Sequence, residues 1–312
     1  MKREKVMKRE IVMEKAKALV VACIFVVITI LGAGCSGAGT PAQEPPEQQV
    51  EPESAGAQQA EPEAAGAPET DPGPESGLAV TGEILIAAAA SLQNALEGEL
   101  IPMFNEEYPD VKVVATFDSS GKLQTQIEEG LDAQLFFSAA TKQMDALVDG
   151  GFIDSATVTG LLENEVVLIT GVDTETAVTG FENITDAASI AVGDPASVPA
   201  GQYAQEVLES LGLWDGVSGG ASLGTNVTEV LNWVAEGSAE VGVVYMTDAA
   251  SMPDKVRVIA TAPEGTLKTP VIYPVGLQPG LGDKAEAAEA FLAFLKGAEA
   301  LEVFKSYGFK PL

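Results

Sequence analysis

From residue 82 onward, short apolar runs alternate with segments of helical hydrophobic spacing, and this alternation limits the folds open to the chain. The apolar runs are continuous, which is typical of strands buried on both faces of a parallel sheet. The expected strands are "EILIAAA" (83–89), "VKVVATF" (111–117), "LFFSA" (135–139), "EVVLIT" (165–170), "SIAVGD" (189–194), "EVGVVY" (240–245), "KVRVIA" (255–260) and "TPVIYPVGL" (269–277). Between many of these strands, apolar residues recur at the spacing of a helix. The sequence therefore predicts an α/β protein with mainly parallel sheets covered by helices.

The charge and the residue types exclude several classes of function. The 312 residues include 17 Lys and Arg against 46 Asp and Glu, for a net charge of −29, and no histidine. Phosphate contacts need clustered basic side chains, so this balance argues against nucleic acid as a partner. Without histidine, the Ser-His-Asp and Cys-His nucleophile systems and the usual transition-metal ligand are missing. We therefore expect no catalytic residue, no metal-cation site and no cofactor.

The first 35 residues have the pattern of a secretion signal. A basic segment precedes the apolar run "ALVVACIFVVITIL" (18–31), which is short for a membrane span. The following "GAGC" resembles a lipoprotein signal, so we expect Cys35 to become the lipidated first residue, although Gly32 stands where a Leu is usual. An ordinary cleaved signal and an uncleaved anchor are the alternatives. Cys23, the one other cysteine, lies in the apolar run, so no disulfide is expected in the folded part.

Residues 36–80 differ in composition from the rest of the chain. They are rich in Pro, Glu, Ala, Gly and Gln, and they contain no aromatic residue, Lys or Arg. Such a segment buries too little apolar surface to offset the entropy of ordering. We expect a disordered acidic tether between a membrane anchor and a soluble domain.

Small and hydroxyl-bearing residues follow the ends of the first two expected strands. Ser91 comes after "EILIAAA" at the start of a helix, and Ser119 and Ser120 follow "VKVVATF", with Gly121 next. Each serine alone is typical of a plain helix cap. Together, two strand ends that present hydroxyl groups and helix N–H groups form a donor-rich cup suited to an anion.

Two further strand ends carry candidate residues. "PAG" (199–201) opens a third helix, where Ala200 and Gly201 allow close approach of a ligand to the backbone. Tyr245 ends an otherwise apolar strand, and its buried phenol requires either a structural hydrogen bond or a ligand. From spacing alone, both alternatives stay open at each position.

Several segments together resemble the molybdate-binding proteins of molybdate ABC importers. They are "AAASLQNAL" (88–96), "FDSSGKLQTQIEEG" (117–130), "LFFSA", "AVGDPASVPAGQYAQEVLESLG" (191–212), "VGVVYMTDA" (241–249) and "FLKGAEALEVFKSYGF" (294–309). The resemblance runs in one order from about residue 82 to 312. It implies a two-lobed, type II periplasmic-binding-protein fold with two crossings between the lobes and a ligand cleft between them. It places lobe I at 82–163 plus 262–312 and lobe II at 164–261.

The resemblance also implies a binding site made of neutral hydrogen-bond donors. The ligand contacts would fall on Ser91, Ser120, Ala200, Val227 and Tyr245. Val227 is a candidate only through the resemblance, because an apolar residue at a helical position is typical of the hydrophobic core. The chain departs from the family pattern at Gln134, where an Asp is frequent, and at Asp118, where small residues are common. A carboxylate at residue 118 leaves the identity of the anion open, since it repels a dianion or accepts a proton from hydrogen phosphate.

These observations lead us to expect a monomeric, lipid-anchored solute-binding protein on the extracytoplasmic face of the cell membrane. It would capture molybdate or tungstate, which the sequence does not separate, and deliver the anion to the transmembrane subunits of an ABC permease. A sulfate- or phosphate-type receptor is the alternative within this class. A serine hydrolase that uses Ser91 with Lys122, and a surface spacer protein, are alternatives from other classes.

Overall fold

The computed structural model of the protein describes residues 80–312. The predicted signal sequence (1–35), Cys35 and almost all of the predicted tether (36–80) lie outside the described residues. Within 80–312, no helix combines the length and the apolar character that crossing a membrane requires. The same residues contain no group of three or more His, Cys, Asp or Glu side chains placed to hold a metal ion.

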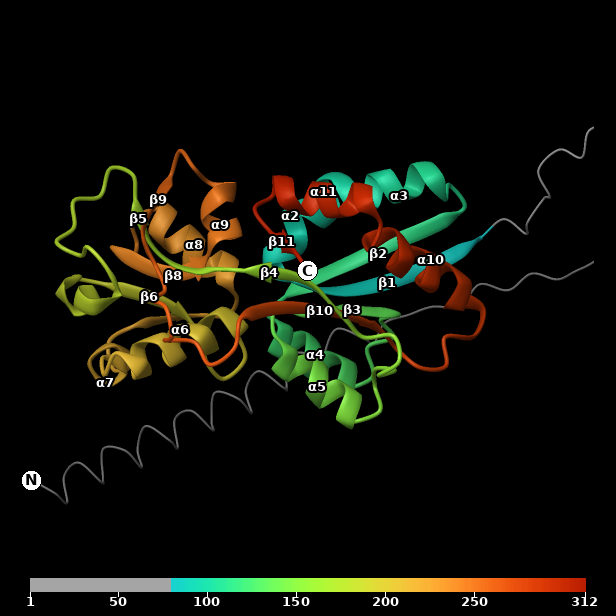
Figure 1. The fold of residues 1–312 in the computed structure, drawn as a ribbon, viewed down its shortest axis with the longest axis horizontal. Helices are drawn as coiled ribbons and strands as arrows, with labels where there is room; N and C mark the ends of the chain where they lie inside the picture. Colours follow the sequence, from blue (N-terminus) through green and yellow to red (C-terminus); the bar gives the residue numbers. More distant parts are fainter. Residues whose placement is uncertain (1–79) are drawn as a thin grey trace, which may run out of the picture. The chain divides into compact units, whose positions relative to one another are not determined.

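The first of two sheets, sheet A, has six strands in the order β11-β4-β10-β3-β1-β2 (Figure 1). Its strands are β1 (Gly82–Ala89), β2 (Val111–Asp118), β3 (Leu135–Phe137), β4 (Thr159–Asn164), β10 (Val271–Leu277) and β11 (Lys310–Pro311). β1 is parallel to β2 and to β3, whereas β10 is antiparallel to β3 and β4, and β11 is antiparallel to β4. We call sheet A and the helices packed on it lobe A.

Helices cover both faces of sheet A. They are η1 (Ala90–Leu92), α2 (Gln93–Ala95), η2 (Leu96–Leu100), α3 (Ile101–Glu107), α4 (Ser120–Glu128), α5 (Thr141–Asp149), η4 (Gly282–Lys284), α10 (Ala285–Leu295) and α11 (Ala298–Ser306). Figure 1 shows α4 and α5 on one face and α3, α10 and α11 on the other. Neighbouring residues of β1 accordingly join different cores: Ile86 belongs to the cluster that contains Phe104 and Phe291, and Ala87 belongs to the cluster that contains Leu123. This two-sided burial explains the continuous apolar run in the sequence.

Sheet B has five strands in the order β7-β6-β8-β5-β9. They are β5 (Val166–Gly171), β6 (Ile190–Gly193), β7 (Ser222–Gly224), β8 (Val241–Tyr245) and β9 (Val256–Thr261). β6 is parallel to β7 and β8, and β5 is antiparallel to β8 and β9. Its helices are η3 (Phe181–Asp186), α6 (Pro199–Ser210), α7 (Trp214–Ser218), α8 (Val227–Ala235) and α9 (Met246–Ser251), with α6 and α8 on opposite faces (Figure 1). Sheet B and these helices form lobe B.

The chain passes between the sheets twice. β4 ends in sheet A at Asn164 and β5 begins in sheet B at Val166, and the return runs from Thr261 at the end of β9 to Val271 at the start of β10. Both sheets contain antiparallel pairs and are mixed, so the prediction of mainly parallel sheets holds only for β1, β2 and β3 in sheet A and for β6, β7 and β8 in sheet B. The antiparallel strands are largely those that carry the chain from one sheet to the other.

Candidate functional site

A small cavity, part of it open to solvent, lies where the two lobes meet. Strand ends and helix starts from both lobes surround it. Its lining residues are Ala89, Ala90, Ser91, Asp118, Ser119, Ser120, Ala139, Val198, Pro199, Ala200, Val227 and Tyr245. No Lys or Arg belongs to this lining, so Asp118 is its one charged residue.

All five predicted ligand residues line this one cavity. Ser91 and Ser120 come from lobe A, and Ala200, Val227 and Tyr245 come from lobe B. Their contact with a ligand stays a prediction. Ala139 and Val198 were missed by the sequence reasoning, although Ala139 ends the expected strand "LFFSA" and the strand-end rule used for the serines applies to it equally.

Three of the α-helices begin at the cavity. Ser120 is the first residue of α4, Ala200 is the second residue of α6 after Pro199, and Val227 is the first residue of α8. The first N–H groups of a helix have no partner within the helix, and the helix dipole leaves about half a positive charge there. Val227 is buried and lines the cavity at the first position of its helix. The cavity therefore combines positive partial charge with N–H donors but no full cation.

The sequence explains how α8 is placed. The side chain of Asn226 accepts a hydrogen bond from the Glu229 N–H at 3.0 Å, and Glu229 Oε2 accepts from the Thr225 N–H at 2.6 Å. This reciprocal cap at the start of "NVTE" fixes where the helix begins. It places Val227 at the first position of α8, where its N–H has no partner within the helix.

Ser120 is oriented as a donor. It is fully buried, and its Oγ accepts a hydrogen bond from the Ala139 N–H at 2.9 Å. A backbone N–H only donates, so the hydroxyl proton of Ser120 is left for another acceptor. Ser120 can thus donate into the cavity.

Tyr245 has a buried hydroxyl group without a hydrogen-bond partner among the described residues. The residue is 1% exposed, and its ring packs edge-on against Tyr203 and Tyr273 at centroid distances of 6.4 and 5.8 Å. Burial is the main cause that raises the pKa of Tyr245 well above its usual 10.0, so the phenol keeps its proton. An unpaired buried hydroxyl costs roughly 1–3 kcal/mol, which a ligand acceptor in the cavity would remove.

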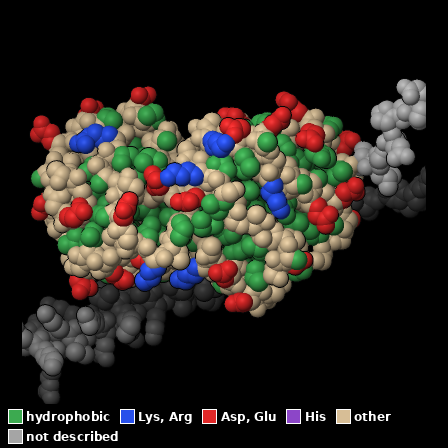
Figure 2. Space-filling model, in the orientation of Figure 1, with side chains coloured by type: hydrophobic (Ala, Val, Ile, Leu, Met, Phe, Trp, Pro, Cys, Tyr) green, Lys and Arg blue, Asp and Glu red, His purple; other side chains and the backbone are tan. Residues whose placement is uncertain are grey.

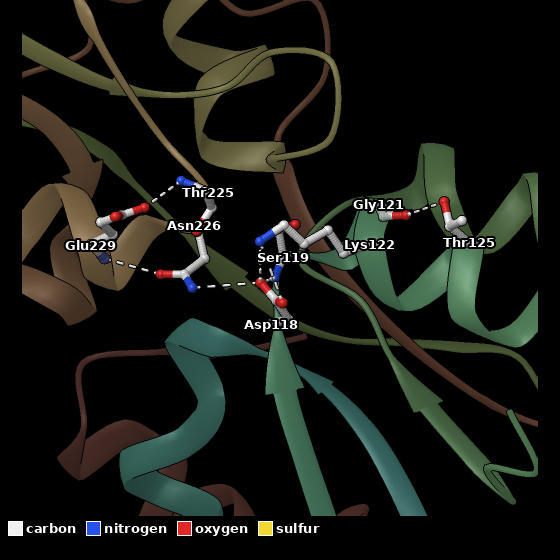
Figure 3. Close-up of polar contacts among 8 residues, drawn as sticks. All are labelled: Asp118, Ser119, Gly121, Lys122, Thr125, Thr225, Asn226 and Glu229. Carbon is white, nitrogen blue, oxygen red and sulfur yellow. Dashed lines mark hydrogen bonds and ion pairs between the residues drawn. The ribbon is translucent and has the colours of Figure 1, made fainter. Parts of the chain in front are cut away.

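Asp118 is held by several donors. Its Oδ1 accepts from the Ser119 N–H at 2.7 Å and from Lys122 Nζ at 3.2 Å, and Asn226 Nδ2 approaches it from lobe B at 3.5 Å. Figure 3 shows Asp118 at the end of its strand, with Asn226 reaching it from the start of α8. The carboxylate is thus occupied by donors, and Lys122 is directed to it.

Polar contacts join the lobes around the cavity. The Gly121 N–H in α4 donates to the Ser197 carbonyl before α6 at 3.0 Å. Gln143 Nε2 in α5 donates to Gln202 Oε1 in α6 at 3.2 Å. With the contact of Asp118 to Asn226, these bonds hold the lobes together in the closed arrangement described here.

Comparisons with known proteins agree with this architecture. The chain is 40% identical over 226 residues to YvgL of Bacillus subtilis, provisionally named an ABC transporter substrate-binding lipoprotein, covering 72% of this chain and 85% of that one. It is 40% identical over 240 residues to the molybdate-binding protein ModA of Escherichia coli, covering 75% and 91%. A solved substrate-binding domain of a provisionally named molybdenum ABC transporter from Clostridium difficile superposes with a TM-score of 0.57 at 36% identity, covering 74% and 99%.

The fold is accordingly that of the two-lobed, type II periplasmic binding proteins, with the cavity between the lobes. A model of the bacterial extracellular solute-binding proteins matches residues 84–310, which is nearly all of the described range 80–312. The chain belongs to the family of bacterial extracellular solute-binding proteins.

Proposed function

We propose that this solute-binding protein captures molybdate or tungstate between its lobes and delivers the anion to the transmembrane subunits of an ABC permease. The observation that carries the proposal is the hydroxyl group of Tyr245, which is buried without a partner and lines a cavity of serines and helix starts. The molybdate-binding protein of Escherichia coli, at 40% identity, supports the choice of anion.

Capture by neutral donors suits a protein with this charge. The chain carries a net charge of −29, and Figure 2 shows acidic side chains spread over the visible face of both lobes. The general field therefore repels a dianion, and affinity has to come from the cavity itself. Fixed hydroxyl and N–H donors at helix starts replace the hydration shell of the anion as the lobes close.

The donors favour an oxyanion that carries no proton. Ser120 and Tyr245 offer protons, and hydrogen phosphate would bring another proton that needs an acceptor. Asp118, the one carboxylate in the lining, is engaged by Ser119 and Lys122. A proton without an acceptor costs roughly 1–3 kcal/mol, which disfavours hydrogen phosphate. Sulfate carries no proton at neutral pH, and we propose that it is disfavoured by its smaller size.

The remaining parts of the proposal follow from the same function. We propose that Cys35 is lipidated and that residues 36–80 form a flexible tether. The lobes comprise 82–163 plus 262–312 and 164–261. The protein acts as a monomer on the outer side of the cell membrane, where its two lobes close on the anion. The name of YvgL as a lipoprotein supports the anchor. Binding without catalysis is part of the proposal, and the hydrogen bond of Ser91 Oγ to Tyr273 Oη rather than to Lys122 supports it.

Calorimetric titration of the protein with molybdate, tungstate, sulfate and phosphate tests the proposal. Molybdate and tungstate are expected to bind at least about 100-fold more tightly than sulfate and phosphate, a difference of about 2.7 kcal/mol. Tight binding of sulfate or phosphate without molybdate would establish the alternative receptor instead. A protein that binds none of the four would not be an oxyanion receptor.

Replacing Tyr245 with Phe or Ser120 with Ala is expected to weaken molybdate binding by about 1–3 kcal/mol each, since each removes one donor to the anion. Titration of each variant measures the loss. Tyr307→Phe and Ser306→Ala remove exposed hydroxyl groups that bond to Glu99 and to the Val303 carbonyl, and they should leave affinity unchanged. Equal affinity in the two cavity variants and the wild type would remove these residues from the site.

Asp118 and Lys122 are expected to act on affinity with opposite signs. Lys122→Met leaves the carboxylate beside the cavity without its cation and should weaken molybdate binding, whereas Asp118→Asn removes the charge and should strengthen it. Each effect should be about 1 kcal/mol or less, because both side chains are partly exposed and solvent screens them. Titrations at low and high salt check the signs, and both effects should shrink at high salt.

A further inference from the structure

A chain of buried hydrogen bonds lies directly behind Ser91. Tyr273 Oη is 2.9 Å from Ser91 Oγ, and Asn164 Nδ2 donates to Tyr273 Oη at 3.2 Å. Asn164 Nδ2 also donates to Thr247 Oγ1 in lobe B at 2.9 Å. Tyr273 is 0% exposed and Asn164 is 4% exposed, so water does not compete for these bonds.

The backbone fixes the direction of this chain. The Glu165 N–H donates to Asn164 Oδ1 at 2.9 Å, and because an N–H only donates, the amide oxygen of Asn164 must lie on that side. The NH₂ group of Asn164 therefore faces Tyr273 and Thr247, and it too only donates. Tyr273 Oη must accept at least one hydrogen bond.

The proton of Tyr273 then has one acceptor, Ser91 Oγ. In the reverse direction, with Ser91 donating to Tyr273, the hydroxyl proton of Tyr273 would have to turn to Tyr245 Oη, whose ring packs against Tyr273 but which makes no hydrogen bond among the described residues. A buried donor without an acceptor is costly, so the chain runs from Asn164 through Tyr273 to Ser91. The hydroxyl proton of Ser91 is left to point into the cavity that Ser91 lines.

We infer that Tyr273 and Asn164 are positioning residues that fix Ser91 as a hydrogen-bond donor toward a fully deprotonated oxyanion. The inference rests on the proposed function, because it assigns a role to residues that do not line the cavity. It also deepens that function, since a serine whose hydroxyl proton is directed into the cavity favours an anion oxygen that accepts over one that carries a proton.

The surroundings of Tyr273 support this direction. Burial is the largest cause that raises the pKa of Tyr273 well above its usual value, and the charge of Asp248 raises it further. The hydrogen bonds to Ser91 and Asn164 act against that rise without cancelling it. Tyr273 thus keeps its proton over the whole neutral range, as donation to Ser91 requires.

A double-mutant cycle on the full protein tests the inference. Molybdate is titrated into the wild type, Ser91→Ala, Tyr273→Phe and the double variant. Tyr273→Phe is expected to weaken binding about tenfold, which is about 1.4 kcal/mol. It should add less than about twofold in the Ser91→Ala background, because Tyr273 acts through Ser91. Losses that multiply in the double variant would overturn the inference.

Two further measurements keep the test decisive. Tyr307→Phe, which loses an exposed hydroxyl bonded to Glu99, is the matched control and should bind as the wild type does. Thermal unfolding checks that each variant folds, and Asn164→Ser replaces Tyr273→Phe in the cycle with the same expected result if the latter does not fold. If the wild type binds no oxyanion, both the proposed function and the inference are overturned. If the wild type binds molybdate but the losses of affinity from the two single substitutions multiply in the double variant, the inference alone is overturned.

Discussion

Replacing Gly121 with Ala is expected to weaken molybdate binding at least about 100-fold, about 2.7 kcal/mol, while the stability of the unliganded protein stays the same or rises. Gly121 lies in the first turn of α4, and its N–H donates to the Ser197 carbonyl of lobe B at 3.0 Å. A Cβ atom at residue 121 would lie 2.3 Å from that carbonyl oxygen and 2.8 Å from the Cα of Ser197. These are backbone atoms, so the lobes themselves would have to move apart.

The open form has no such conflict. Gly121 is helical and is not among the glycines with positive φ, so alanine fits its backbone. Alanine in place of glycine within a helix stabilises it by roughly 0.5–1 kcal/mol. The substitution therefore favours the open form over the closed one, and a ligand that needs closure loses affinity accordingly.

Titration and thermal unfolding of Gly121→Ala check both halves of this prediction. Gly219→Ala is the matched control, because a Cβ atom at Gly219 meets nothing within 4 Å and its φ is −75°. The control should bind molybdate as the wild type does. Wild-type affinity in Gly121→Ala would show that the contact between the lobes is not needed for binding.

Asp248→Asn is expected to stabilise the protein at pH 8 by about 2–4 kcal/mol. Asp248 is buried next to the end of β8, and burial raises its pKa from 3.8 to about 7. The native state therefore binds the proton more tightly than the unfolded chain does. The free energy of unfolding should fall as pH rises from about 4 to about 7, and it should level off above that range.

Urea unfolding of both proteins from pH 4 to pH 8 measures this effect. Asparagine keeps an oxygen that can accept the Tyr245 N–H, which Asp248 Oδ2 accepts at 3.0 Å, so the start of α9 should be preserved. The gap between the two curves should be small near pH 4 and widest at pH 8. A constant gap, or a gap that narrows with rising pH, would contradict the raised pKa.

The sequence predicted the parts of the site that follow from local rules. Ser91, Ser120 and Tyr245 stand at strand ends, where the ligands of open α/β sheets bind, and the structure brings all three to one cavity. Val227 was predicted as a ligand residue only through the family resemblance, although the helix cap before it offered a local signal. Asn226 followed by Glu229 is a capping-box pattern, and it places residue 227 at the first helical position.

Long-range contacts could not be predicted in this way. Tyr273 lies far from Ser91 in the sequence, and Asn164 meets Tyr273 only because β4 and β10 pair side by side. The spacing of residues along the chain does not predict which strands pair with each other. The contact of Asp118 with Asn226 could not be predicted for the same reason, since Asn226 belongs to the other lobe.

The most direct test of the central claim is a crystal structure of the protein with tungstate, located by the anomalous scattering of tungsten. We predict one tungsten peak in the cavity between the lobes, with its oxygens bonded to Ser91, Ser120, Tyr245 and the N–H groups of Ala200 and Val227, and with no Lys or Arg in contact. A peak elsewhere, or an anion bound by Lys122, would contradict capture by neutral donors.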